Sequence, residues 1–455
     1  MSAELLASAD WEGKAYDGSW KPLRGGVIDV REPATGEVLA RVAAANPADV
    51  RDACALARLA QPQWGKMAYG DRAALFRKAA AIVEQNRADI AGLIGRETGG
   101  IVPKAMFEID SVLYLLNEAA AMLTQPKGLV LPSQDGCVSL ARRVPHGVVG
   151  VISPFNFPFL LSCRAALPAL ATGNAVVLKP DPRTPVSGGV LLALLMQQAG
   201  LPPGVLCVLP GAADAGEALI VDPDVAMISF TGSTAVGRRV GELAGKNLKK
   251  VALELGGKNS LIILDDADLA LAISGGSWAS WLHQGQICMS AGRHLVHRSL
   301  ADEYCRQMAE KAVHLPVGNP CTGQVALGPL ITLKQTERVD RIVRESVKMG
   351  ARLLAGGEAN GQFYPATVLS NVTPDMPAYR EEIFGPVVAV TPFETDDEAV
   401  ALANANSDAS LITFDKSLAG KVVGMTDGQL VLTTDIRING DIVTAGGAPG
   451  QDSPT

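Results

Sequence analysis

The chain has few of the residues that bind metals or cross-link secreted proteins. Its 455 residues include only 5 histidines and 7 cysteines. The cysteines are odd in number and form no CxxC pair, and no two histidines stand in an HxxxH pattern. These absences argue against a metal site and against a disulfide framework, and they favour a reducing cytosol.

Long apolar runs and clusters of positive charge are also missing. Apolar stretches such as 147–152 are too short to span a bilayer, and the first six residues lack the basic and apolar regions of a secretory signal. Lys and Arg number 40 against 47 Asp and Glu, which gives a net charge of -7 and a pI near 5.4. We therefore expect a cytoplasmic protein that has neither nucleic acid nor a membrane as a partner.

The chain is rich in apolar sequence, and from about Val144 this sequence alternates between short strands and helices. Apolar residues make up 48% and charged residues 19%, and the length requires two or three domains. We expect strands at 147–152, 175–178, 205–209, 225–230 and 250–255, separated by helices at 165–171, 187–199, 214–220 and 235–243. This alternation predicts a parallel α/β sheet with helices on both faces, and such sheets bind ligands at the carboxyl ends of their strands.

The remaining parts of the chain are less regular. The first forty residues are rich in Gly, Pro and Trp, and we expect them to run over the surface. Helical patterns occupy 46–99 and 109–123, and a second α/β unit is expected over 259–391. Past Asn406 the pattern weakens, and 445–455 has the composition of a disordered polar tail.

One cysteine differs from the others in its context. Cys288 lies in the segment Gln284–Met289, which reads QGQICM, between a Gly-Gln turn and a β-like run, whereas the other six stand in apolar or helical stretches. A thiol presented from a tight turn can be reached by a substrate, whereas a thiol in an apolar run usually fills space. Cys288 is therefore a candidate nucleophile, although a lone cysteine is more often structural.

Two polar residues next to apolar segments are candidates for supporting chemistry. Glu254 stands inside an apolar strand ahead of a Gly-Gly turn, and burial disfavours the charged form of a carboxylate, which suits a general base. The alternative is a carboxylate satisfied by the amides of that turn. Asn156 is held between aromatics and prolines in Pro154–Pro158 and could donate to an oxyanion, although Asn beside Pro is common in turns.

Three further motifs have features of nucleotide sites. The segment Phe230–Gly237 follows a strand and opens a helix, so its amides suit a phosphate, but it is neither a GxGxxG nor a Walker A motif. Lys179 ends a strand and could hold a ribose hydroxyl or a phosphate. Glu382 could accept ribose hydroxyls, and the ring of Phe384 could lie against a flat cofactor. Each motif also fits an ordinary strand end, turn or helix end.

Taken together and in this order, these motifs and the Cys288 turn resemble the aldehyde dehydrogenase superfamily over residues 25–406. The segment 283–298, together with 11–14 and 24–27, is similar to benzaldehyde dehydrogenases of aromatic catabolism. The resemblance implies an α/β fold of two doubly wound parallel domains plus a small β oligomerisation element. The implied parts are a dinucleotide-binding domain (1–122 and 142–256), a catalytic domain (257–430) and an oligomerisation element (123–141 and 431–455).

The resemblance also implies a reaction, the oxidation of an aromatic, benzaldehyde-like aldehyde to the carboxylate with NAD. Cys288 would carry a thiohemiacetal and then a thioester, Asn156 would stabilise the oxyanion, and Glu254 would activate the hydrolytic water. No metal is implied. The implied cofactor contacts are Ile152, Pro154, Lys179, Gly211, Phe230, Gly232, Ser233, Val236, Leu255, Glu382 and Phe384. The implied substrate pocket comprises Phe157, Leu161, Arg164, Ile287 and Met289.

Two departures from the family pattern leave alternatives open. Many members carry an acidic residue for the adenosine ribose where this chain has Pro182, between Asp181 and Arg183. Asp181 could partly substitute for that residue, whereas Arg183 could meet the 2′-phosphate of NADP. The stretches 408–424 and 440–455 are unlike the family, which leaves the pocket wall and the contacts of a homodimer or homotetramer undefined.

The reaction class also has alternatives. These are a CoA-acylating enzyme, an aliphatic or semialdehyde dehydrogenase, and an inactive nucleotide-binding descendant. Glu254 argues against the CoA-acylating enzyme, because a water-activating base would hydrolyse the thioester.

Overall fold

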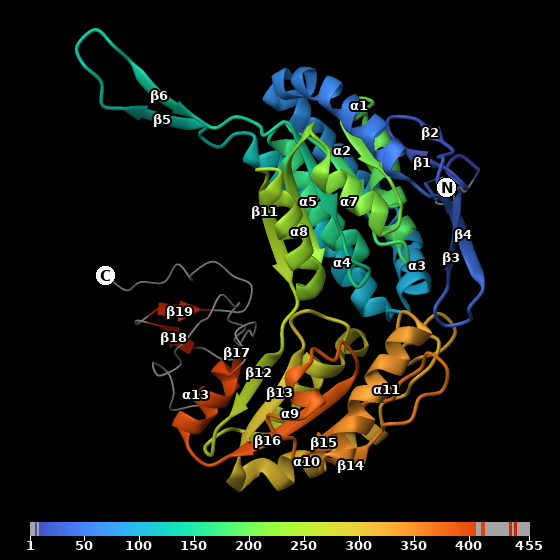
Figure 1. Ribbon diagram of the computed structural model, residues 1–455, viewed down its shortest axis with the longest axis vertical. Coiled ribbons are helices and arrows are strands. Elements are labelled where there is room, and N and C mark those ends of the chain that lie inside the picture. Colours follow the sequence, from blue (N-terminus) through green and yellow to red (C-terminus); the bar gives the residue numbers. More distant parts are fainter. Residues whose placement is uncertain (1–4, 7–8, 406–410, 415–435, 439–440, 444–455) are drawn as a thin grey trace. The chain divides into compact units, whose positions relative to one another are not determined.

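The computed structural model describes residues 5–6, 9–405, 411–414, 436–438 and 441–443. Within them the chain divides into two compact units. The first comprises the described residues up to Thr98 together with Val102–Leu255. The second comprises Gly99–Ile101 together with the described residues from Gly256 onward. Figure 1 labels the elements of both units along the chain.

The first unit is built on a seven-stranded sheet with the order β11-β10-β7-β8-β9-β1-β2. Its strands are β1 (Ala15–Tyr16), β2 (Trp20–Lys21), β7 (Val148–Ile152), β8 (Ala175–Lys179), β9 (Leu206–Val208), β10 (Val225–Gly232) and β11 (Lys250–Leu255). Strands β7 to β11 are parallel, whereas β1 pairs antiparallel with β9. The order reverses between β7 and β10, so the sheet is doubly wound. The central strands are buried runs of Val, Leu and Ile, the composition expected for a parallel strand covered on both faces.

Helices cover both faces of this sheet. On one face, α7 packs against both α1 and α8. On the other face, α4 packs against α2 and α5, and α2 also packs against α6. The helices are α1 (Pro47–Lys66), α2 (Tyr69–Gln85), α3 (Arg87–Thr98), α4 (Val102–Met122), α5 (Pro158–Ala171), a π-helical turn η1 (Val186–Val190) that continues into α6 (Leu191–Ala199), α7 (Ala213–Val221) and α8 (Thr234–Lys246). Helix α1 begins with a capping box, in which Asn46 and Asp49 satisfy each other's backbone N–H groups.

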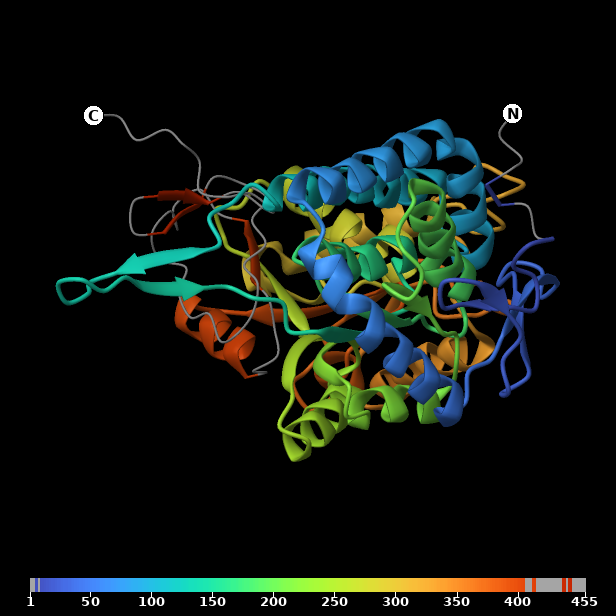
Figure 2. The same ribbon diagram turned by 90° about the horizontal axis from the view of Figure 1, so that it is seen from above.

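Two hairpins complete the first unit. One pairs β3 (Val27–Arg31) with β4 (Val38–Ala43), and the other pairs β5 (Gly128–Leu131) with β6 (Ser139–Arg142). The β5–β6 hairpin projects away from the rest of its unit in both views (Figures 1 and 2).

The second unit has a six-stranded sheet with the order β14-β15-β16-β13-β12-β17. All neighbours are parallel except β14, which pairs antiparallel with β15. The strands are β12 (Asn259–Ile263), β13 (Ala291–His297), β14 (Arg352–Ala355), β15 (Thr367–Ser370), β16 (Val387–Phe393) and β17 (Leu411–Phe414), with a separate pair β18 (Ile436–Ile438) and β19 (Asp441–Val443). The helices are α9 (Leu269–Trp281), the 3-10 turn η2 (Leu282–Gly285), α10 (Arg298–Val313), α11 (Leu333–Lys348), α12 (Pro377–Arg380) and α13 (Asp396–Asn404).

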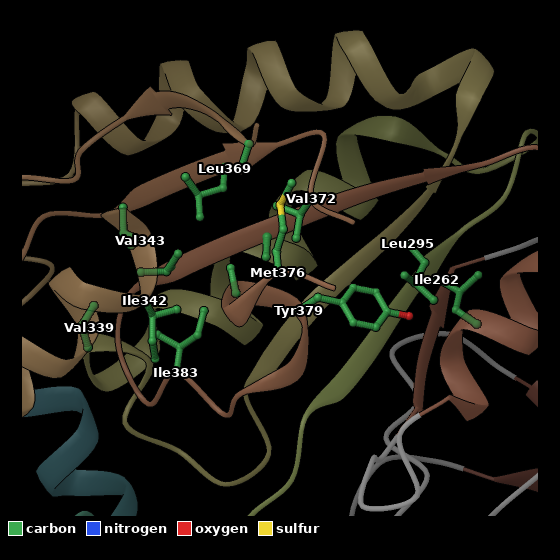
Figure 3. Packing of buried hydrophobic residues seen from close by; sticks show 14 of the residues in the cluster. Ile262, Leu295, Val339, Ile342, Val343, Leu369, Val372, Met376, Tyr379 and Ile383 are labelled. Atoms are coloured by element: carbon green, nitrogen blue, oxygen red, sulfur yellow. The ribbon is translucent and has the colours of Figure 1, made fainter. Parts of the chain in front are cut away.

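The core of the second unit lies on both faces of its sheet. One apolar cluster contains residues of α9 and α10, and the other contains residues of α11 and α12. In the latter, Val339, Ile342 and Val343 of α11 point toward Leu369 and Ile383 (Figure 3). Their spacing of three and four residues gives α11 one apolar face, and burying each such side chain contributes about 1.5–3 kcal/mol.

The predicted α/β fold is confirmed, but three local predictions are wrong. The helix expected over 109–123 begins at Val102. The first forty residues, expected to run over the surface, contribute β1 and β2 to the first sheet, because β1 pairs with β9. The helix expected from residue 165 begins at Pro158, because proline suits the first helical turn and a distant carboxylate caps this end. The predictions for 408–424, 440–455 and the tail fall mainly outside the described residues. In the described part of the chain, no helix combines the length and apolar character needed to cross a membrane.

Candidate active site

Five predicted cofactor residues lie at the carboxyl edge of the first sheet. Phe230 of β10 pairs with Ile152 of β7, and Ile152 pairs with Lys179 of β8. Gly232, the last residue of β10, pairs with Leu255 of β11. Because the strand order reverses between β7 and β10, this edge contains the switch point at which doubly wound sheets bind ligands.

Lys179 is buried at the end of β8. Its Nζ donates to the carbonyl oxygen of Pro180 at 3.1 Å. Burial lowers the pKa of this ammonium, and the carboxylates of Asp181 and Asp214 act in the opposite direction. The lysine stem runs past Gly216 of α7, where a Cβ would lie 3.5 Å from the lysine Cδ. With three donor hydrogens, Lys179 can bind a further acceptor at this edge.

The junction of β10 and α8 forms an exposed helix N-terminus. Ser233 is the N-cap residue, and its Oγ accepts a hydrogen bond from the N–H of Val236 at 3.4 Å. The side chain of Val236 is exposed. Pro154 follows β7 and is half-buried, and Gly211 lies after β9, where it forms a bridge with Ala45.

Asn156 lies in the turn between β7 and α5 and is buried, as is Phe157. The ring of Phe157 meets that of Phe107 edge to face, with the centroids 6.1 Å apart. Farther along α5, Leu161 is half-buried and Arg164 is exposed. The turn thus combines a rigid amide with an aromatic ring.

Glu254 is exposed, so the prediction that it is buried is wrong. The reason is that β11 is the outermost strand of its sheet in the described residues. Lys250 and Val251 of the same strand are exposed as well. Any role for Glu254 as a base must therefore come from its position and not from burial within its strand.

In the second unit, Cys288 is half-buried in the loop between η2 and β13. The last three residues of η2, directly before this loop, are in the left-handed conformation: His283 (φ 47°), Gln284 (φ 55°) and Gly285 (φ 66°). Non-glycine residues in this region are strained, and such strain is often stored at functional sites. At Gly285 a Cβ would overlap the carbonyl oxygen of Gly385, so only glycine fits there.

Three buried amide side chains hold this loop. Gln284 Nε2 donates to the carbonyl oxygens of Gly99, at 2.8 Å, and Pro329, at 3.3 Å. Gln286 Oε1 accepts from the N–H of Ile331 at 3.0 Å. Asn259 Nδ2 donates to the carbonyl oxygens of Cys288, at 2.8 Å, and Ser290, at 3.1 Å.

The other six cysteines have different environments. Burial raises the pKa of four of them, which makes them poor nucleophiles: Cys54, Cys163, Cys207 and Cys305. The remaining two, Cys137 and Cys321, are exposed in loops, so the prediction that they lie in apolar or helical stretches is wrong. Among the described residues, no cluster of His, Cys, Asp and Glu is suited to a metal ion.

Glu382 and Lys258 form an oppositely charged pair beside the Gly256–Gly257 turn. The Gly257 N–H donates to the Glu382 carboxylate, and burial raises the pKa of this carboxyl to about 7. The pKa of Lys258 is lowered to about 7, mainly by burial and also by the charge of Arg293, while Glu382 acts in the opposite direction. Within the described chain, Glu382 Oε1 and Lys258 Nζ are buried without a hydrogen-bond partner.

The segment that contains Glu382 and Phe384 is fixed by α11. Arg338 donates to the carbonyl oxygens of Glu382, at 2.6 Å, and Ile383, at 2.8 Å. Gln335 Nε2 donates to the carbonyl oxygens of Ile383, at 3.2 Å, and Phe384, at 2.9 Å. Phe384 has a positive φ of 52°.

The predicted site residues are therefore divided between the units. The first unit contains Asn156, Glu254 and most of the cofactor candidates. The second contains Cys288, half-buried Ile287, exposed Met289, Glu382 and Phe384. Sequence reasoning assigned no role to the side chains that fix the second group, which are Asn259, Gln284, Gln286, Gln335 and Arg338, or to Lys258, which acts on the Glu382 carboxyl through its charge. The only feature of the sequence that could have revealed these supporting side chains is that each is a polar residue next to a motif or a buried strand.

Comparison with known proteins identifies the family. Residues 20–428 match the model of the Aldehyde dehydrogenase family, and the chain belongs to that family. It is 53% identical over 400 residues to a vanillin dehydrogenase of an Amycolatopsis species, covering 88% of this chain and 82% of the relative.

Two further relatives have related names. The chain is 47% identical over 395 residues to benzaldehyde dehydrogenase [NAD(+)] of Pseudomonas putida, covering 87% of this chain and 81% of the relative. The crystal structure of an NAD-dependent benzaldehyde dehydrogenase from Corynebacterium glutamicum matches with a TM-score of 0.84 at 37% identity, covering 89% of this chain and 90% of that chain.

Proposed function

We propose that this protein oxidises an aromatic aldehyde to the carboxylate, with NAD as hydride acceptor and Cys288 as nucleophile. The relatives above are named for vanillin and benzaldehyde, two aromatic aldehydes. The observation that carries the proposal is the Cys288 loop. All seven cysteines are described, and Cys288 alone is half-buried on a strained loop held by buried amides.

In the proposed reaction the Cys288 thiolate forms a bond to the carbonyl carbon, and negative charge moves to the aldehyde oxygen. The Asn156 amide and the Cys288 N–H would donate to this oxyanion. Bound NAD would supply the hydride acceptor, and loss of the hydride from the same carbon would leave a thioester on the Cys288 sulfur. Glu254 would take a proton from water, which attacks the thioester and releases carboxylate and thiol. The first unit would then be the dinucleotide-binding domain and the second the catalytic domain.

The residues present fit a dinucleotide. The exposed N-terminus of α8 offers backbone N–H groups and the positive end of a helix dipole to a phosphate. In the second unit, the buried Glu382 Oε1 has no hydrogen-bond partner in the described part of the chain, so it can accept a ribose hydroxyl. Lys179 has donor hydrogens available at the first sheet's carboxyl edge.

Arg183 supports NAD over NADP. Asp181 binds its guanidinium through two oxygens, at 2.7 and 2.6 Å, and the guanidinium lies 4.0 Å from the centroid of the Phe155 ring. Because a carboxylate already neutralises this cation, its attraction for a 2′-phosphate is reduced.

A steady-state panel of aromatic and aliphatic aldehydes with NAD and NADP tests the proposal. We expect NADH formation with benzaldehyde and vanillin without added CoA, and loss of turnover by at least about 10³-fold in Cys288→Ala. Cys137→Ser and Cys321→Ser are the matched controls, because both thiols are exposed in loops, and they should leave turnover unchanged. A requirement for CoA, or no aldehyde-dependent reduction of either cofactor, would overturn the proposal.

We further propose that the protein is a cytoplasmic homodimer or homotetramer that assembles through the β5–β6 hairpin. Its apolar side chains are exposed, including Leu129 (69%), Val130 (78%) and Leu140 (58%). An exposed two-stranded apolar ribbon is unstable alone and usually marks an interface. Light scattering of the native protein and of Val130→Asp tests this. A smaller particle for the variant is expected, and a monomeric native protein would refute the assembly.

A further inference from the structure

Glu97, Lys104 and Glu108 are buried, ionisable and coupled electrostatically in the first unit, and they lie outside the proposed reaction. Glu97 ends α3, and Lys104 and Glu108 lie one turn apart near the start of α4. The side chains of Lys104 and Glu108 are 0% exposed. Lys104 Nζ lies 2.5 Å from Glu108 Oε1 and 3.4 Å from the hydroxyl of Thr98. Burying such a pair costs several kcal/mol per ion, and an apolar pair of similar volume would usually be no less stable.

Glu108 provides the cap that α5 lacks. The N-cap residue of α5, Phe157, makes no capping hydrogen bond with its side chain, and Pro158 has no N–H to donate. The N–H of Leu160 instead donates to Glu108 Oε2 at 3.1 Å, and the N–H of Phe159 donates to the same carboxylate. A carboxylate from α4 therefore satisfies the first free donors of α5 and meets the positive end of its dipole.

Lys104 connects this cap to the turn before α5. Its ammonium neutralises Glu108 and lies 4.8 Å from the centroid of the Phe157 ring, a cation–π contact. Phe157 directly follows Asn156, and Pro158 restricts the backbone of Phe157. A displacement of the first turn of α5 would therefore also move Asn156, which lies two residues before the first residue of the helix.

Glu97 caps the helical segment that follows β8, which begins with η1 and continues into α6. Its carboxylate accepts the N–H groups of Val186, at 2.8 Å, and Ser187, at 2.7 Å, and also the hydroxyl of Ser187. Buried carboxylates thus fix the helix starts that follow both β7 and β8. Only the Glu108 cap lies next to a proposed reacting group, and only this cap carries a buried lysine.

We propose that Lys104 and Glu108 are positioning residues for the oxyanion donor. They hold the first turn of α5, and with it the Asn156–Phe157 turn, in the orientation that catalysis needs. This inference rests on the proposed function, because it gives Asn156 its role. A misplacement of about 1 Å in such a group can cost about 10²-fold in rate.

The test is a double-mutant cycle between the ion pair and Asn156. We expect Lys104→Met and Glu108→Gln to lower kcat for benzaldehyde by about 10- to 100-fold, with little change in KM or in NADH binding measured by fluorescence. Lys104→Arg should restore much of the loss. In an Asn156→Ala background, the same substitutions should cost less than about 3-fold, because the donor that they position is gone.

The control removes the surface ion pairs of Arg87, the first residue of α3, instead of the buried pair within α4. Arg87 Nη2 lies 2.5 Å from Asp110 Oδ1, and Asp110 is largely exposed. Arg87→Met should leave kcat unchanged. If Glu108→Gln does not fold, Lys104→Met/Glu108→Leu removes both charges together and leaves no unpaired buried ion.

The outcomes separate the two proposals. If Asn156→Ala alone retains normal kcat, the oxyanion role in the proposed function fails. If Asn156→Ala is impaired but the ion-pair substitutions cost the same in both backgrounds, the proposed function stands and the positioning role is refuted. Loss of NADH binding in parallel with kcat would also refute it, because it would show a general structural defect.

Discussion

The two units use opposite ends of similar sheets. In the first, the candidate residues Ile152, Lys179 and Gly232 close strands β7, β8 and β10. In the second, the candidates come before their strands, with Cys288 ahead of β13 and Glu382 ahead of β16. The rule that parallel sheets bind ligands at their carboxyl ends therefore matches the candidate residues of the first unit and not those of the second.

The difference changes how each group of residues is held. At the carboxyl edge of the sheet, each strand is followed by the start of a helix. The candidate residues there are held by helix backbone N–H groups and by the side chains that cap them, as at α5 and α8. The amino edge of such a sheet has no helix N-terminus, because the helices start beyond the carboxyl ends of the strands. The loops of the second unit are held by side-chain amides and by Arg338. The amino-edge loops should therefore be more sensitive to single substitutions.

Among the substitutions that test this difference between the units, the largest effect is expected at Gly285. Alanine there combines a positive φ with overlap of Gly385 O, so Gly285→Ala should lower kcat by at least about 100-fold and also lower the melting temperature. Gly361→Ala is the matched control, since Gly361 has a φ of 60° but open space around its Cβ position. It should cost only about 1 kcal/mol in unfolding free energy and leave kcat unchanged. Near-normal kcat in Gly285→Ala would show that this loop tolerates displacement.

The next effect concerns ionisation at the amino edge. Burial raises the pKa of Glu382 to about 7, so acidification through pH 7 should protonate it and weaken NADH binding by about 10-fold at pH 6. Lys258 lowers this pKa, as does Arg338, so Lys258→Met should move the midpoint to higher pH. Fluorescence titrations between pH 6 and 8.5 check both expectations, with Glu382→Gln as the variant whose binding should not vary with pH. An unchanged midpoint in Lys258→Met would contradict the coupling.

A third prediction concerns acid stability of the second unit. His294 is buried between the hydroxyls of Ser280 and Tyr304, each 2.7 Å away, and burial lowers its pKa to about 3. Because the unfolded chain binds the proton near pH 6.5, this contribution to stability is present above pH 6.5 and is lost as the pH falls. The loss is about 1.4 kcal/mol per pH unit down to about pH 3. Urea unfolding at pH 7.5 and 5.5 should show a smaller difference for His294→Gln, whereas exposed His314→Gln should behave like the native protein.

The smallest effect is expected beside the carboxyl edge. Removing the carboxylate in Asp181→Ala releases Arg183 from its ion pair, so the ratio of kcat/KM for NADP to that for NAD should rise by about 5-fold. Asp181→Ala/Arg183→Ala should lose this gain. A ratio that stays constant in both variants would mean that this pair does not affect cofactor choice.

Local sequence was enough to predict the five parallel strands of the first sheet, because buried parallel strands are short apolar runs bounded by turn residues. It did not predict β1 and β2, whose place beside β9 depends on long-range pairing. It was also enough to recognise Cys288, whose turn is contiguous. The burial of Glu254 was predicted wrongly, because the place of β11 in the strand order depends on long-range pairing. The start of α5 at Pro158 was missed, since its cap comes from Glu108 on another helix.

The supports of the Cys288 loop were missed for the same reason. Gln284 bonds to Gly99 and Pro329, and Gln286 bonds to Ile331, which are all distant in the sequence. A glutamine near a motif gives no local sign of such a partner. Candidate chemistry was therefore easier to predict than the residues that hold it in place.

The tripeptide Gly99–Ile101 has a practical consequence for dissection of the enzyme. The chain leaves the first unit after Thr98, contributes three residues to the second and returns at Val102. A fragment that starts at Gly256 would lack the carbonyl oxygen of Gly99 that accepts from Gln284. Expressing the halves separately would therefore remove a hydrogen bond that holds the Cys288 loop, and a split enzyme should keep Gly99–Ile101 together with the second unit.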